Sequence, residues 1–262
     1  MAKTIIVTGR GGTGKSTFAA LGSRFLAPPK LLVDADPDQC LGQMLGVPPA
    51  QRDTRTVSEV LHDIQKGRTE GGIESLPLSE QVEYLLHYDC LEETPDFDLI
   101  TLGVKWTPGC YCAPNNILRN IIPEIASGYQ YTILDSPAGL EHLNRRVLRR
   151  ANDVFAIMDP SSKSIRNART VREFADEIDF HFDNLYLVAN HRFGDRDLDR
   201  LEAVEGTTLL GRMKSDPTVQ EADWEGRCLL EIPADSPACQ SVRRILQAAG
   251  YEVTSGSPVA SS

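Results

Sequence analysis

The residues Thr4-Ile5-Ile6-Val7-Thr8-Gly9-Arg10-Gly11-Gly12-Thr13-Gly14-Lys15-Ser16-Thr17 decide the fold class of this 262-residue chain. An apolar run of strand length leads into a glycine-rich segment that fits the pattern G-x-x-x-x-G-K-[ST]. The apolar stretch Phe18-Ala19-Ala20-Leu21 follows it and favours a helix. Such glycines let successive backbone N–H groups turn into one concavity, and the helix adds the positive end of its dipole. The sequence therefore predicts a phosphate-binding loop between a strand and a helix.

This loop predicts a nucleotide site with defined roles. We expect Lys15 to reach the β- and γ-phosphates and Ser16 to ligate Mg²⁺. The nucleotide-binding residues expected in the loop are Gly11, Gly12, Thr13, Gly14, Lys15, Ser16 and Thr17.

Apolar runs of strand length recur along the chain, with segments of helix length in most of the gaps. They cover residues 4–8, 31–33, 98–102, 131–134, 154–158 and 185–189. This alternation predicts an α/β fold with a mostly parallel central sheet and helices on both faces. Ligands in such sheets bind beyond the carboxyl ends of the strands. The notable polar residues follow strand ends in the same way, so we expect one site there.

Composition limits the domain count and the class of partner. The chain is long enough for one large α/β domain, which we expect over residues 1–250, with a disordered polar tail at 254–262. It carries 37 acidic and 27 basic residues, and this net charge of −10 argues against nucleic-acid binding. No apolar run has the length of a membrane span, and residues 1–3 lead directly into a strand, so we expect a cytoplasmic protein without a membrane partner.

Two segments carry an uneven charge. Residues 50–109 hold twelve Asp and Glu against five Lys and Arg, and they interrupt the strand–helix rhythm. This segment is predicted to be an acidic insertion, either a solvated surface or a docking face for a partner or a cation source. Arg145, Arg146, Arg149 and Arg150 have the spacing of a basic stripe on one helix.

Three aspartates follow apolar strands and are candidates for phosphate chemistry. Asp34 and Asp36 end the second strand two residues apart, on the same side of an extended backbone. Two buried like charges are costly unless a cation or a catalytic role compensates them. We assign Asp36 to the attacking water and Asp34 to the outer shell of the magnesium ion. Asp135, at the end of another apolar strand, is the second predicted magnesium carboxylate.

The six cysteines fall into two groups. Cys40, Cys90, Cys228 and Cys239 are scattered and are predicted to be small apolar fillers. Cys110 and Cys112 are separated by one residue and flanked by Gly109 and Pro114, so both thiolates can face one side. Tetrahedral zinc or planar Ni(II) takes four ligands, of which one subunit offers two and two subunits offer four. These two cysteines are therefore candidate ligands of a metal held between subunits.

The order of these elements resembles the deviant phosphate-loop ATPases, a group that includes the MinD, ParA, nitrogenase iron-protein and arsenite-pump families. That group works as nucleotide-sandwich dimers, in which a signature lysine crosses to the other subunit's phosphates. Arg10 stands at that position here. The resemblance implies a catalytic role for Arg10 across a homodimer, ATP or ADP as the nucleotide, and contact of Asn190 with adenine. Residues 210–216 depart from the pattern that usually lies near the adenine.

Within this group the chain looks like the CooC-type nickel-insertion ATPases that mature carbon monoxide dehydrogenase. The similar segments are residues 34–43, Cys110-Tyr111-Cys112, and residues 135–143 with the ending Gly-x-Glu-His-Leu. The resemblance implies Ni²⁺ or Zn²⁺ at the dimer interface and a nickel enzyme as client, either carbon monoxide dehydrogenase or acetyl-CoA synthase.

Two other functions fit the phosphate loop alone. A positioning ATPase of the MinD or ParA type would use no metal, but it needs a basic DNA surface or a membrane helix. An iron–sulfur reductase like the nitrogenase iron protein needs a cysteine after the second switch, and residues 136–143 contain none. The metallochaperone interpretation is therefore preferred.

Overall fold

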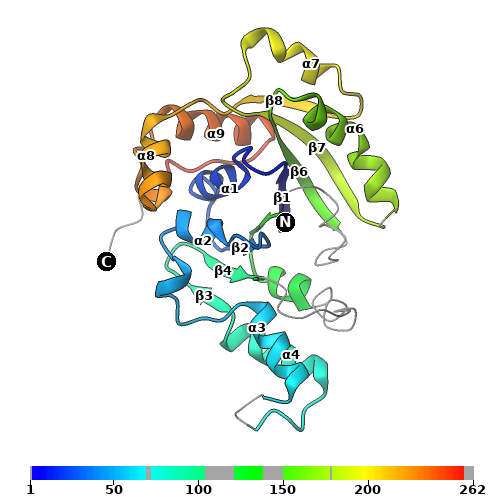
Figure 1. Ribbon diagram of the computed structural model, residues 1–262, viewed down its shortest axis with the longest axis vertical. Helices are drawn as coiled ribbons and strands as arrows, with labels where there is room; N and C mark the ends of the chain where they lie inside the picture. Colours follow the sequence, from blue (N-terminus) through cyan, green and yellow to red (C-terminus); the bar gives the residue numbers. More distant parts are fainter. Residues whose placement is uncertain (1, 69–71, 104–120, 138–149, 178, 257–262) are drawn as a thin grey trace.

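Eight strands form one sheet in the computed structural model, which describes residues 2–68, 72–103, 121–137, 150–177 and 179–256 (Figure 1). The strands are β1 (Lys3–Gly9), β2 (Lys30–Asp34), β3 (Leu91–Glu93), β4 (Asp98–Thr101), β5 (Tyr131–Asp135), β6 (Arg150–Met158), β7 (His181–Ala189) and β8 (Thr208–Arg212). Their spatial order is β3-β4-β2-β5-β1-β6-β7-β8, and only the β3–β4 pair is antiparallel. The predicted mostly parallel sheet is confirmed.

The six predicted apolar runs all become strands, and the two strands that were not predicted lie at the edges of the sheet. The edge strand β3 contains Leu91 and two glutamates, and all three residues are at least partly exposed. The other edge strand, β8, has no fully buried residue, and its register with β7 shifts between Leu187 and Val188. An edge strand buries too little surface to show a clear apolar pattern.

Alternate side chains of the strands enter two hydrophobic cores, one on each face of the sheet. In β1, Ile6 packs into one core, while Ile5 and Val7 pack into the other. The Ile6 side is covered by α3 (Val57–Lys66), α4 (Leu78–Tyr88), the helical residues 121–126, α6 (Ser162–Glu177) and α7 (Asp199–Glu202). The opposite side is covered by α1 (Lys15–Ser23), α2 (Cys40–Met44), α8 (Pro217–Glu225) and α9 (Pro237–Ala248). Short 3₁₀ turns lie at Pro49–Gln51, Asp195–Asp197 and Leu229–Glu231.

The acidic segment of residues 50–109 contributes both to the sheet and to a projecting helix pair. Its strands β3 and β4 extend the sheet beyond β2, so they are part of the central fold. Its helices α3 and α4 lie at the lower end of the molecule in Figure 1. A capping box begins α3, because Thr56 and Glu59 each bond the other's backbone N–H. These side-chain hydrogen bonds therefore fix the N-terminus of α3 at Thr56.

The predicted basic helix stripe is wrong at its last member. Arg150 opens β6 and pairs with Asp183 of β7 at 2.8 Å, so it lies on a strand. Arg145, Arg146 and Arg149 lie outside the described residues. No helix in the described part of the chain combines the length and the apolar character that a membrane crossing requires.

Candidate functional site

A cavity of about 610 Å³ lies beyond the carboxyl ends of the central strands. It gathers the predicted loop residues with two polar residues from other strand ends. The expected residues that line it are Gly11, Gly12, Thr13, Gly14, Lys15, Ser16, Thr17, Asp36 and Asn190. The parallel topology brings them together, because β1, β2 and β7 end at the same edge of the sheet.

The conformation of the phosphate loop depends on a left-handed glycine and on contacts with the carbonyl oxygen of Arg10. Gly14 has a φ of +97° and precedes the first residue of α1, a conformation that favours glycine. The hydroxyl of Thr13 donates to the carbonyl oxygen of Arg10 at 2.8 Å, and Nζ of Lys15 lies 3.4 Å from the same oxygen. The side chain of Lys15 is thereby held across the loop, where a phosphate can replace the carbonyl as its partner.

Asp34 shapes the loop that presents Asp36. Both carboxylate oxygens of Asp34 accept backbone N–H groups, from Asp36 and from Leu41, each at 3.2 Å. Burial raises the pKa of Asp34 to about 6, although the backbone N–H groups of Asp36 and Gly42 lower it. Asp36 lines the cavity, and its carboxylate accepts the N–H of Asp38 at 3.1 Å. The predicted magnesium role of Asp34 stays a prediction, because in this structure its oxygens organise the segment of residues 34–41.

Asp135 has the properties of a magnesium carboxylate. Its side chain is fully buried, and neither oxygen has a hydrogen bond of ordinary geometry among the described residues. Burial raises its pKa to about 7, and the charge of Asp34 acts in the same direction, while Ser16 and Lys15 oppose it. An unsatisfied carboxylate next to the loop hydroxyl is a donor set that fits a hard divalent cation. Ser16 and Asp135 therefore suit Mg²⁺ bound with nucleotide phosphates.

Asn190 follows β7 and is tied to the phosphate loop. Its amide nitrogen donates to the carbonyl of Thr13 at 3.4 Å, and its amide oxygen accepts the N–H of Arg192 at 3.1 Å. These bonds fix the side chain at the wall of the cavity. Its predicted contact with adenine stays a prediction.

Arg10 forms an ion pair and a hydrogen bond with residues of its own chain. Its Nη1 lies 3.2 Å from the Asp159 carboxylate and donates to the Ser161 hydroxyl at 2.9 Å. The Ser161 N–H and hydroxyl also bond Asp159. Arg10 is therefore anchored to the turn that follows β6 and does not line the cavity.

Part of the cavity wall was not predicted. It includes Met44 of α2 and Val219, Gln220 and Asp223 of α8. Residues 213–215, which follow β8, also line the cavity, and they belong to the segment 210–216 that departs from the pattern usually found near the adenine. Asp216 caps α8 by accepting the Thr218 N–H, and it also accepts the N–H of Ala238 from α9. The run Asp216-Pro217 is a helix-start signal that could have placed α8. The sequence does not indicate which face of α8 lines the cavity, because tertiary packing decides it.

The described cysteines only partly fit the prediction that they fill apolar gaps. Cys90 and Cys239 are buried and Cys228 is half-buried, but Cys40 is exposed and lines the cavity. Cys110 and Cys112 lie outside the described residues. Within the part of the chain that is described, no group of three or more His, Cys, Asp and Glu side chains is arranged to hold a metal.

Comparisons with known proteins agree with this geometry. The AAA domain family matches residues 2–184. An uncharacterized ATP-binding protein of Methanocaldococcus jannaschii is 30% identical over 93% of this chain and 96% of its own length. The carbon monoxide dehydrogenase accessory protein CooC of Rhodospirillum rubrum is 27% identical, over 95% of this chain and 96% of that protein.

Among solved structures, the septum site-determining protein MinD of Pyrococcus horikoshii, complexed with Mg-ADP, superposes with a TM-score of 0.66. It is 21% identical, and the match covers 95% of this chain and 96% of that one. This likeness shows the shared fold. The phosphate loop follows the buried strand β1, Lys15 and Asp36 line the same cavity, and the family match covers residues 2–184. The chain therefore belongs to the AAA domain family and is a phosphate-loop ATPase.

Proposed function

We propose that this ATPase is a homodimeric metallochaperone that binds Ni²⁺ or Zn²⁺ and assists nickel insertion into carbon monoxide dehydrogenase or acetyl-CoA synthase. The observation that carries the proposal is the pair Cys110 and Cys112 in a chain that aligns with CooC over nearly its full length. Two thiolates from each subunit complete a four-ligand site. The protein acts in the cytoplasm, with a nickel enzyme as its client and without nucleic acid or membrane.

The hydrolytic step uses residues that line the described cavity or flank it. The backbone N–H groups of residues 11–17 and Nζ of Lys15 hold the phosphates. Asp36 orients the water that attacks the γ-phosphorus, so that phosphate is released and ADP remains in the loop. Ser16 and Asp135 would hold Mg²⁺, which would supply positive charge beside the phosphates when bound. Arg10 supplies positive charge to the partner subunit's phosphates.

Nucleotide and metal are coupled through the dimer. ATP brings the two phosphate loops face to face, and this closure brings the four cysteines together around one metal ion. Hydrolysis loosens the dimer and releases the metal to the client. The proposal therefore requires that metal content follows oligomeric state.

A combined measurement tests the proposal. The protein is loaded with Ni²⁺ or Zn²⁺, separated by size-exclusion chromatography with ATP, ADP or no nucleotide, and analysed for metal in each peak. We expect one metal per dimer, and loss of the metal in the Cys110→Ser/Cys112→Ser variant with ATP binding retained. Cys90→Ser/Cys239→Ser is the matched control for loss of two thiols. Metal-free dimers of the wild-type protein contradict the metallochaperone function and favour a positioning ATPase.

A further inference from the structure

Exposed apolar side chains are concentrated on α4 and the loop before it. Of the five large hydrophobic side chains that the described residues expose, four lie between residues 76 and 88: Leu76, Leu78, Tyr84 and Tyr88. The rings of Tyr84 and Tyr88 are 4.4 Å apart between centroids, and Tyr88 is 71% exposed. Contiguous exposed apolar surface of this kind marks an interaction site more often than scattered single residues do.

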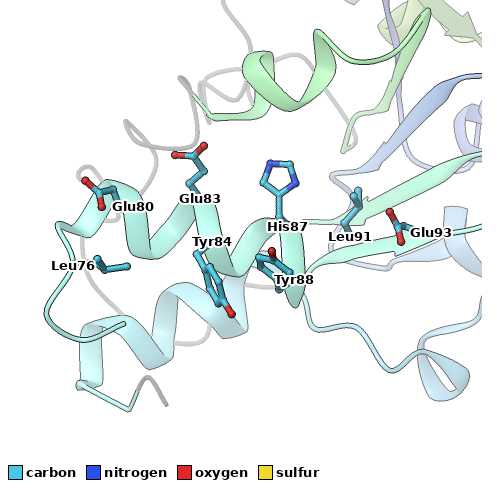
Figure 2. A pocket seen from close by; sticks show the side chains of 8 residues that line it. All are labelled: Leu76, Glu80, Glu83, Tyr84, His87, Tyr88, Leu91 and Glu93. Atoms are coloured by element: carbon cyan, nitrogen blue, oxygen red, sulfur yellow. The ribbon is translucent and has the colours of Figure 1, made fainter. Parts of the chain in front are cut away.

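Three of these side chains, Leu76, Tyr84 and Tyr88, line a groove of about 600 Å³ between α4 and the edge strand β3. Figure 2 shows Glu80, Glu83 and His87 on one flank of α4, with the two tyrosine rings side by side on the other. Glu93 of β3 adds a further carboxylate to the lining. None of the three glutamates forms an ion pair with any described residue.

We propose that this groove docks a segment of another protein that carries Lys or Arg next to aliphatic side chains. The carboxylates pair with the cations, the two adjacent tyrosine rings offer both apolar area and cation–π contact, and Leu76 contacts aliphatic groups. Nucleic acid is excluded because the carboxylates repel phosphate. A second copy of this chain, whose net charge is −10, would bring like charges together. The groove shares no lining residue with the nucleotide cavity, so docking does not depend on the metallochaperone proposal.

A labelled synthetic peptide that alternates Lys with Leu tests the groove by fluorescence anisotropy. We expect Glu80→Lys/Glu83→Lys to weaken peptide binding at least about tenfold and Tyr84→Ala/Tyr88→Ala to weaken it severalfold, with ATPase activity unchanged. The matched control is Glu173→Lys/Glu177→Lys on exposed positions of α6, which changes the net charge equally. The proposal fails if both charge reversals weaken binding equally, or if the groove variants bind as the wild type does.

A second, independent observation concerns Arg52, which lies beneath the segment that carries Asp36. Its Nε donates to the carbonyl of Val47 at 2.6 Å, and its Nη1 donates to the hydroxyl of Thr101. Its Nη2 is buried without a hydrogen-bond partner among the described residues. A Cβ added to Gly42 of α2 would lie 1.5 Å from this Nη2, so only glycine lets the guanidinium pass under the helix.

Arg52 also faces Asp34 electrostatically, and Asp34 holds the backbone of residues 36 and 41. The end of β2 is paired with Thr101 of β4 in register, so the guanidinium links β4 to the loop after β2. We infer that Arg52 is a positioning residue for hydrolysis. Its guanidinium packs against α2 and faces Asp34, and Asp34 in turn holds the backbone of the segment that carries Asp36. Arg52 thereby fixes the position of Asp36 without contacting the nucleotide.

Steady-state ATPase kinetics of matched variants test this role. We expect Arg52→Ala and Gly42→Ala each to lower kcat about tenfold while KM for ATP stays within about twofold, because the phosphate loop is untouched. The double variant should lie close to Arg52→Ala alone, since the two contacts under 3.0 Å are with the Arg52 guanidinium and only the contact with the Val47 carbonyl oxygen at 3.0 Å remains. Gly22→Ala is the control, because its Cβ would meet only ordinary contacts at 3.8 Å. Additive losses, a change in KM alone, or an unchanged kcat would overturn the inference.

Discussion

Asp34, the last residue of β2, and Asp36 and Asp38 in the loop after it differ in what their carboxylates contact. Asp34 is fully buried and bonds two backbone N–H groups, whereas Asp36 and Asp38 are both at the cavity. Only Asp36 combines a place in the cavity with backbone support from the Asp34 loop. The residue type is the same at all three positions, so their roles are separated by geometry.

Asp36→Ala is therefore expected to slow ATP hydrolysis about 100-fold while ATP affinity changes little, because the loss falls on the attacking water. Single-turnover hydrolysis and equilibrium nucleotide binding measure the two quantities separately. Asp38→Ala, two residues away and also at the cavity, is the matched control and should retain hydrolysis. Equal rates in the Asp36 variant and the wild type would remove Asp36 from the reaction.

Asp135 gives the site a pH dependence with a defined sign. Its folded pKa is raised by burial to about 7 from 3.8, so its contribution to the free energy of unfolding is full below pH 4 and is lost as pH rises through 7. Mg²⁺ needs the ionised form, so the Mg²⁺ concentration for half-maximal turnover should fall up to about tenfold per pH unit between pH 6 and 7. Mg²⁺ titrations of ATPase activity at several pH values measure this.

Asp135→Asn provides the internal comparison. At pH 8 without nucleotide it should raise the free energy of unfolding by on the order of 1 kcal/mol, because the buried charge of Asp135, which lies near the charge of Asp34, is removed. It should also lower Mg²⁺-dependent turnover strongly. A variant that is destabilised at pH 8 but fully active would show that Asp135 is a structural carboxylate.

Among the helices and strands, the sequence predicts the strands whose side chains are buried in the sheet. Six buried or half-buried strands have apolar runs that indicate them, and the phosphate loop is recognisable from its own residues. The edge strands β3 and β8 could not be recognised, because their side chains are partly exposed. The contact between Arg10 and Asp159 spans 149 residues, and no local pattern encodes such a pairing. Likewise, α8 has a readable cap, but its place at the cavity is set by packing against α9 and the turn Leu229–Glu231.

The junction of β1 and the loop makes an element-scale prediction. Gly9 has a φ of +148°, and an added Cβ would stand 2.4 Å from the carbonyl oxygen of Ile157 in β6. Gly9→Ala should therefore cost about 2 kcal/mol or more in the free energy of unfolding, by forcing β1 and β6 apart. Gly12 has a φ of +73°, and an added Cβ would meet no atom of the described residues within 4 Å, so Gly12→Ala should cost about 1 kcal/mol from backbone strain alone. Urea denaturation of both variants measures the difference, and equal costs would contradict the close approach of the strands.

For the whole molecule, Arg10 connects the single chain to the proposed dimer. In the chain described it is held by Asp159 and Ser161, with about a third of its side chain exposed. The Asp159 side of the pair is buried, but Arg10 reaches solvent, and such a partly exposed ion pair contributes on the order of 1 kcal/mol. A phosphate on a partner subunit, which binds arginine more strongly, can therefore displace Asp159 from Arg10. Arg10 can thus bind Asp159 in the monomer and a phosphate of the partner subunit in the dimer, because the contact with Asp159 is the weaker of the two.

Two variants separate these states by sedimentation with a non-hydrolysable ATP analogue. Arg10→Ala should bind the analogue but stay monomeric, because the charge that crosses the interface is gone. Asp159→Asn weakens the anchor, so it should shift dimerisation to severalfold lower protein concentration. Asp183→Asn, which breaks the exposed pair with Arg150, is the matched control and should leave dimerisation unchanged. A dimer of undiminished strength in Arg10→Ala would confine Arg10 to its contact with the turn after β6, and the proposed role of Arg10 across the dimer would be wrong.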